Sequence, residues 1–534
     1  MAITIHYIDA PPDKPNDWEL KSELLGFTEI KGNHGGANTA ATMLNVFDRY
    51  GIRSKLGWAT GDNVMVNDKA TRCIQRDPEV NRPERPWIAR QRHGRCMEHV
   101  VHLAAKDFIE AINPTKPKSK RTTRNGTAAI EDDEDEEDDE DWTVDWTMLD
   151  ELLEGQEIDD PVDFEAGDVV GKILAFINQL RSSPQARTFF AKMCKEEGLT
   201  PLQLIKWIRT RWRSMYDLID CALTVKQAIN KFILLADSSP EVPTLNGKRY
   251  DDYKMSSDEW DMLELVREVL AEPREAQSCF SSETVPTVGK TLPILECLQE
   301  RWTTFASLPK FAPVKDAIEK GLKKLRKWYK ATDATDMYFI CLALDPSIKL
   351  EYCKNKWDQR HYDAGRKSLE KTFDMYASRT SSEPIEPAPP PASSPVKRTG
   401  YGASWLEAAI RPRVQAEASM RDPREELKEY LAAPLEWGLQ DPVKWWGVRA
   451  CPLITRTSIP LLLAWLGTTS RFRDPLFHPS VHSQVGGLTS TLLRNQLTPQ
   501  TFEALQILKS GYKHRFVDAT EEAAVHEPGA WTAA

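Results

Sequence analysis

An unbroken run of 11 acidic residues, 131–141, divides the chain into two parts. Like charges at this density repel one another and hold water, so the run cannot lie inside a packed core. The 534-residue chain carries a formal net charge of −10, and removing these 11 negative charges leaves +1. A basic cluster at residues 116–124 precedes the run and is typical of a nuclear localisation signal or a phosphate-contacting patch. We therefore expect a solvated linker between two separately packed segments.

The segment before the linker has the pattern of an α/β fold. Residues 2–8 and 18–27 are rich in β-forming side chains on either side of a Pro-rich turn, which predicts two strands. A helix is expected over residues 35–50 and a third strand over residues 55–60. Asp62 follows this third strand, so we expect its carboxyl group where a strand meets a loop.

Helical apolar spacing takes over beyond the linker and predicts an all-α block. Helices are expected at residues 161–182, 187–196, 201–234, 257–271, 289–306, 312–332 and 358–377. A second linker, rich in Pro, Ser and Ala, follows this block. The expected fold class is therefore α/β plus all-α. Its expected parts are an α/β domain, a linker, an all-α domain, a linker, a helical carboxy-terminal region and a tail, at residues 1–112, 113–160, 161–380, 381–419, 420–514 and 515–534.

Cysteine spacing and hydropathy limit where the protein can work. The nine cysteines have no regular spacing, and the amino terminus lacks the basic and apolar regions of a secretory signal. No apolar run reaches the roughly 18 residues that a membrane-spanning helix needs. We expect an intracellular protein with reduced thiols and no membrane role.

Four blocks of short motifs follow one another at a particular spacing. The first block holds residues 2–9, 24–27, 34–38, 50–52, 55–56, 60–63 and 67–68. The second holds 95–99 and 102–108, the third 210–216 and 344–349, and the fourth 426–430, 441–446, 458–460 and 494–497. In this order the blocks resemble the transposases of the hAT superfamily of DNA transposons. The resemblance extends over residues 2–514.

The resemblance implies a ribonuclease-H-like catalytic domain interrupted by a large all-helical insertion domain. Such a domain uses two Asp and one Glu to hold two Mg²⁺ or Mn²⁺ ions. Hard cations take oxygen ligands, and two of them bridging a phosphate activate a water or 3′-hydroxyl and stabilise the leaving oxygen. Asp62 matches the second catalytic, metal-binding Asp of the family. In the alternative interpretation, its carboxylate caps a Gly-containing turn.

The other two carboxylates of the family cannot be matched. The strand bearing the first Asp is expected before residues 2–8, and the chain begins inside that motif. No Glu occurs between Trp437 and Phe502, where the helix-borne Glu is expected, and Asp474 stands in a Pro-flanked turn sequence. Residues 461–492 also depart from the family's pattern. We therefore expect a chain that does not cut DNA.

An aromatic residue between two arginines is the candidate DNA-binding site. Trp212 stands between Arg211 and Arg213, where the family has an aromatic that can stack on a nucleotide flipped out beside the cut. Stacking suits any base, and the arginines can meet phosphates. In the alternative, Trp212 packs in the core beside Trp207 and Tyr216.

Cys96 and His99 form the family's Cys-x-x-His block, and His93 and His102 extend it at spacings of three on an expected helix. Because this spacing drifts around a helix, the four side chains cannot converge on one ion, which favours packing over a zinc site. The helix expected over residues 315–330 has a basic face that is suited either to phosphates or to solvent.

The carboxy-terminal blocks resemble the family's dimerisation region. Trp445 and Trp446 offer large aromatic surfaces, and Phe502, Leu505 and Leu508 fall on one stripe of an expected helix. We expect these five residues to join two copies of the chain.

Taken with the resemblance, these features predict a nuclear, hAT transposase-derived protein that keeps DNA-binding and dimerisation surfaces without catalysis. Two alternatives stay open. One is an active transposase, with Mg²⁺-dependent DNA cleavage and strand transfer, whose first Asp and Glu are lost through a faulty gene model. The other is a helical interaction protein of the nucleus. No zinc-finger DNA reader occurs in the sequence, so we do not expect specific recognition of transposon ends.

Overall fold

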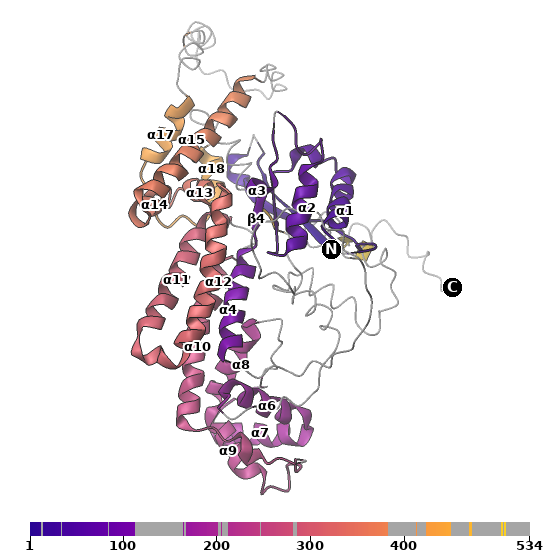
Figure 1. The fold of residues 1–534 in the computed structure, drawn as a ribbon, viewed down its shortest axis with the longest axis vertical. Helices are drawn as coiled ribbons and strands as arrows, with labels where there is room; N and C mark the ends of the chain where they lie inside the picture. Colours follow the sequence, from indigo (N-terminus) through magenta and orange to yellow (C-terminus); the bar gives the residue numbers. More distant parts are fainter. Residues whose placement is uncertain are drawn as a thin grey trace, which may run out of the picture.

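The computed structural model describes most of the α/β and helical segments. The described residues are 1–112, 164, 167–200, 204, 212–280, 286–382, 413, 423–449, 469–471, 504, 505, 507 and 508, without residues 12, 13, 34, 84 and 246. Both linkers expected from the sequence lie almost wholly outside these residues. An α/β part lies at one end of a long helical body (Figure 1). This arrangement agrees with the predicted fold class, while the ribonuclease-H-like topology stays a prediction.

The first two strands form a hairpin. β1 (Ala2–Asp9) pairs antiparallel with β2 (Glu19–Phe27), and η1 (Pro15–Asp17) lies between them. Ile3 on β1 is 2% exposed, and Leu25 on β2 is also buried. The two predicted strands are confirmed.

A second set of strands runs parallel. β3 (Trp58–Gly61) pairs on one side with β4 (His93–Arg95) and on the other with β5 (Thr469–Arg471). β3 is shorter than predicted because η2 (Arg53–Lys55) occupies the start of the expected strand. β5 also lies against β1, so it stands between the hairpin and β3.

Three helices cover this part of the molecule: α1 (Gly36–Arg49), α2 (Met65–Gln75) and the short α3 (Ala89–Arg92). α1 and α2 pack against each other. Their apolar faces and the strands share a core of buried side chains, namely Ile3, Leu25, Ala40, Met43, Val46, Phe47, Ala59, Ala70, Ile74, Val80, Trp87 and Ala89.

The helical body is built on four long helices: α4 (Met97–Ile112), α10 (Ser257–Phe280), α11 (Thr291–Ser307) and α12 (Lys315–Ala331). α4 packs along α12 and also contacts α10 (Figure 1). α4 thus packs with the helical body, although the sequence division at residue 112 assigned it to the α/β domain. Its Val100, Ala104 and Phe108 are fully buried in the core of the helical body.

The end of the helical body away from the strands holds α6 (Val169–Ser182), α7 (Pro184–Glu196), α8 (Trp212–Thr224) and α9 (Lys226–Ala236). The expectation of one continuous helix over residues 201–234 is wrong, because the chain leaves helical geometry at Val225, where ψ is 20°, and this break separates α8 from α9. No Pro or Gly marks this break, so the apolar period runs on through it.

The end near the strands holds α13 (Met337–Ala343), α14 (Glu351–Lys356), α15 (Gln359–Ser382), α17 (Pro423–Ala432) and α18 (Pro442–Arg449). Short 3-10 helices join the longer elements: η3 (Tyr250–Tyr253), η4 (Val288–Lys290), η5 (Pro309–Val314) and η6 (Thr332–Ala334). No helix among the described residues is long and apolar enough to cross a bilayer.

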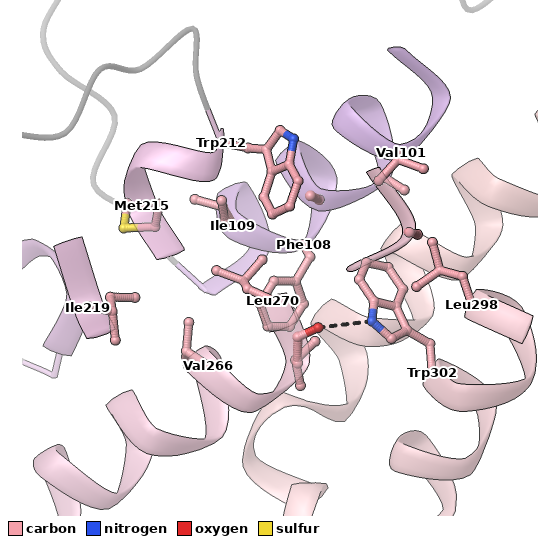
Figure 2. Packing of buried hydrophobic residues seen from close by; sticks show 14 of the residues in the cluster. Val101, Phe108, Ile109, Trp212, Met215, Ile219, Val266, Leu270, Leu298 and Trp302 are labelled. Atoms are coloured by element: carbon pink, nitrogen blue, oxygen red, sulfur yellow. Dashed lines mark hydrogen bonds between the residues drawn. The ribbon is translucent and has the colours of Figure 1, made fainter. Parts of the chain in front are cut away.

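Trp302 lies among the buried side chains of the helical core (Figure 2). Its indole is fully buried, and Nε1 donates to the carbonyl oxygen of Val269 at 3.1 Å. α12 approaches this ring at Gly321, where an added Cβ would overlap the Trp302 ring and lie 2.9 Å from the carbonyl oxygen of Ala104. Glycine therefore allows α12, α11 and α4 to pack closely at this level.

Candidate functional site

Asp62 lies directly after β3, at the carboxyl end of the strand. The backbone N–H of Cys96 donates to the carbonyl oxygen of Gly61 at 3.1 Å, which aligns the ends of β3 and β4. Asn63 donates from Nδ2 to the carbonyl oxygen of Cys96 at 3.1 Å, and Asn67 donates to the carbonyl oxygen of Asp62 at 3.2 Å. These hydrogen bonds hold the loop that carries Asp62. The loop lies at the carboxyl ends of the parallel strands, where ligands commonly bind.

A charged cluster lies beside this edge. Asp68 on α2 forms ion pairs with two residues: its Oδ1 lies 3.0 Å from Nδ1 of His93 and 2.7 Å from Nη1 of Arg95. Burial acts to raise the pKa of Asp68, but the hydrogen bonds and charge of His93 and Arg95 outweigh it and hold this pKa below its ordinary value. The Arg95 guanidinium also lies 5.6 Å from the ring centre of Trp328 on α12. This cluster connects the strands to the helical body, and sequence reasoning missed it because Asp68 is 25 positions before His93 and 27 before Arg95.

The residues present at the edge do not by themselves fit a two-metal centre. Among the residues that the structure describes, no three His, Cys, Asp or Glu side chains are grouped so that they could hold a metal ion. Asn63 and Asn67, which hold the loop of Asp62, carry amide groups, and these cannot replace carboxylates as ligands for two divalent ions. Asp474, which follows β5, lies outside the described residues.

The Cys-x-x-His block is divided between two elements. His93 belongs to β4, so the expectation of one helix carrying all four residues is wrong, and Cys96 stands between β4 and α4. His99 and His102 are 2% and 3% exposed on α4, with ring centres 6.0 Å apart. Burial, followed by the charges of His99 and Lys106, lowers the pKa of His102 well below its ordinary value. Both rings are packed inside the helical body.

Trp212 is 3% exposed and belongs to the main core (Figure 2). Its ring lies near Phe108 and Ile109 of α4, while Met215 follows on its own helix (Figure 2). Arg213 is exposed, with Nε 4.0 Å from Oδ2 of Asp217, and Arg211 lies outside the described residues. The conformation therefore agrees with the core-packing interpretation, since a stacked nucleotide would need an exposed ring face.

The tryptophans of the expected dimerisation region pack within the chain. Trp446 is 3% exposed, and its Nε1 donates to the carbonyl oxygen of Leu344 at 2.9 Å. The ring of Tyr430 lies 4.8 Å from that of Trp446, and the neighbouring Trp445 is partly buried. Trp446 is therefore not available to a second copy in this conformation. Phe502 lies outside the described residues, whereas Leu508 is 47% exposed and Leu505 is half-buried.

A buried lysine connects α17 to the helical body through hydrogen bonds. Lys349 is 2% exposed, and its Nζ donates to the carbonyl oxygens of Tyr430 and Ala433 at 2.6 Å and of Pro434 at 3.2 Å. The hydroxyl of Tyr430 in turn donates to the carbonyl oxygen of Ala343 at 2.9 Å. Lys349 is the last residue of the third motif block, and the structural role of this lysine was not predicted from the sequence. The lysine satisfies carbonyl groups at the end of α17, where helices leave acceptors unpaired.

Two family models match the chain. Residues 1–83 match the ZBED1 RNase-like domain, and residues 94–269 match the ZBED1 RNase-like helical domain. The second match begins within β4 and contains all of α4, in agreement with the packing of that helix. Residues 84–93 separate the two matches.

Three curated proteins are similar over long stretches. The putative transcriptional regulator tpeD of Talaromyces stipitatus is 23% identical over 394 residues, which are 73% of this chain and 39% of that protein. The putative AC transposase of Zea mays is 22% identical over 547 residues, covering 99% of this chain and 56% of the relative. The putative AC9 transposase of Zea mays is 22% identical over 539 residues, covering 95% and 54%. The chain thus spans about half the length of the two transposases and is similar to them along nearly all of its own length.

Proposed function

We propose that the protein is a nuclear, hAT transposase-derived DNA-binding protein that does not cleave DNA. The observation that carries the proposal is the position of Asp62 at the carboxyl end of β3, in the segment that matches an RNase-like domain. The sequence supplies no Glu between Trp437 and Phe502 to complete the carboxylate set. One carboxylate cannot hold the two cations that activate the nucleophile and stabilise the leaving oxygen.

A cleavage assay on the full chain tests this proposal. Labelled duplexes that carry hAT transposon ends are incubated with Mg²⁺ or Mn²⁺, and we expect binding without nicks, hairpins or strand transfer. Asp258→Ala is the matched control for Asp62→Ala, because Asp258 is exposed on α10, far along the chain from the strands. Cleavage by the wild-type chain that persists in Asp258→Ala and disappears in Asp62→Ala would support the active-transposase alternative instead.

A second candidate function is regulation of transcription. Its support is the similarity to a protein named as a putative transcriptional regulator, which extends over 73% of this chain. Regulation requires DNA binding but no cleavage, so Asp62→Ala is expected to leave transcript levels unchanged. The test compares transcript levels in three kinds of cells, which carry the wild-type gene, the gene deletion or Asp62→Ala. A deletion that leaves every transcript level unchanged contradicts this second candidate.

The proposed protein partner is a second copy of the chain. Because Trp446 is buried within one chain, the surface is proposed to include Leu508, which is 47% exposed. Sedimentation of the full chain is expected to give a dimer that Leu508→Glu weakens. Leu234→Glu is the control, because Leu234 is 72% exposed on α9. A wild-type chain that stays monomeric across the micromolar range would remove this partner.

A further inference from the structure

The outward face of α12 is basic over most of its length. Its exposed side chains at residues 320–330 are all cationic, and we name them the α12 basic stripe: Lys320, Lys323, Arg326, Lys327 and Lys330. The opposite face is buried in the helical core through Ile318, Leu322, Leu325 and Trp328. The burial of that face fixes the orientation of the helix, so the stripe must point away from the core.

The stretch of α12 that carries the stripe contains no acidic residue. At the start of α12, Lys315 lies 3.8 Å from Glu319, but no Asp or Glu occurs between residues 320 and 332. The half-buried Lys324 approaches Asp107 of α4 at 3.4 Å and is not part of the stripe. Two exposed acids, Asp333 and Asp336, follow beyond the end of the helix.

The placement of these charges argues against a role limited to the helix end. Basic residues in a last turn are favoured by the helix dipole, but this effect fades within one turn. Lys320 and Lys323 lie two turns or more before the end at Ala331. Between Lys320 and Lys330 the helix rises roughly 15 Å, which matches about four phosphates of one DNA strand at their axial spacing.

The stripe leads toward the edge that holds Asp62. α12 runs along the helical body and ends near the α/β part (Figure 1). There the ring of Trp328 lies 5.6 Å from the Arg95 guanidinium, and Thr335 donates to the carbonyl oxygen of Gln91 at 2.7 Å. A duplex lying on the stripe would therefore extend toward the ends of β3 and β4.

We propose that the α12 basic stripe binds the phosphate backbone of duplex DNA without regard to sequence. The inference rests on the proposed function, since it names the surface that such a DNA-binding protein uses. Lys and Arg at this spacing release counterions from DNA, and the affinity then falls as the salt concentration rises. Base edges are not contacted, so random and transposon-end duplexes bind alike.

The test compares two pairs of lysine substitutions in the full chain. Lys323→Gln with Lys330→Gln removes two charges from the stripe, and Lys367→Gln with Lys371→Gln removes two exposed charges from α15. Binding to a labelled random duplex is measured by fluorescence anisotropy at several salt concentrations. The stripe pair is expected to reduce the slope of log K against log salt by about 1.8 and to weaken binding up to roughly 60-fold at 0.1 M salt. The α15 pair is expected to match the wild type.

Three other outcomes would contradict the proposed DNA-binding role of the stripe. If the wild type binds and the two pairs of variants behave alike, the stripe is not the binding surface, and the proposed function still stands. If the wild type does not bind duplex DNA at low salt, both proposals fail. If an RNA duplex of the same sequence binds more tightly and alone responds to the stripe pair, the stripe is an RNA surface and the DNA proposal fails.

Discussion

Replacing Lys349 by Met tests how the α17–α18 segment is held to the helical body. The lysine is 2% exposed and donates to three carbonyl oxygens, those of Tyr430, Ala433 and Pro434. Its backbone has a φ of 48°, a left-handed conformation that aims the side chain from the loop after α13. Met keeps the length and apolar stem of the side chain but leaves the three carbonyls without their donor.

The expected effect follows from two opposing contributions. A hydrogen bond to a charged group contributes roughly 1.5–3 kcal/mol, whereas burying the ammonium group costs several kcal/mol, so the net effect is well below the sum of three bonds. We expect the docking of α17 to weaken by about 3 kcal/mol, which corresponds to roughly 150-fold in the local opening equilibrium.

Hydrogen–deuterium exchange of the full chain measures this opening directly. Peptides from residues 423–449 are expected to exchange faster in Lys349→Met, and peptides from α9 are expected to keep their wild-type rates. Lys428→Met is the control, because Lys428 is exposed on the same α17. Equal exchange of residues 423–449 in the wild type and in Lys349→Met would refute the reasoning, since the lysine would then contribute nothing net to docking.

Three further substitutions test the core. Trp212→Ala should destabilise the chain by about 3–5 kcal/mol in thermal or urea unfolding, whereas unchanged stability with weaker binding to DNA carrying an unpaired base would favour a stacking role. Gly321→Ala should lower stability by about 1–3 kcal/mol, because its Cβ would overlap the Trp302 ring; an unchanged melting temperature would contradict that packing. His102→Gln should reduce the loss of unfolding free energy below about pH 6.5, because the pKa of His102 is depressed in the folded state and the unfolded state therefore binds the proton first. If the variant loses as much stability in acid as the wild type, protonation of His102 is excluded as the cause.

The position of Asp62 could be predicted from the sequence, whereas its surroundings could not. The residues that predict the preceding strand are adjacent in the chain, and β3 ends directly before Asp62, as expected. The surroundings of that carboxylate could not be predicted in the same way. Asp68 and Arg95 are 27 positions apart in the chain, and nothing in their local sequence indicates that they pair. Their contact depends on β3 and β4 lying side by side and on α2 packing over them.

The sequence by itself determined the local elements. Alternating and helical apolar spacing, with Pro-rich turns, predicted the hairpin, α1 and most of the long helices, because strands and helices expose their faces with fixed periods. Tertiary structure decided what covers each apolar face. Trp212 and Trp446 each have a face that suits a ligand or a second chain equally well, yet α4 covers the first and the end of α13 receives the second. A period identifies an apolar face, but the partner that buries it comes from a distant part of the chain and is fixed only when the whole core packs.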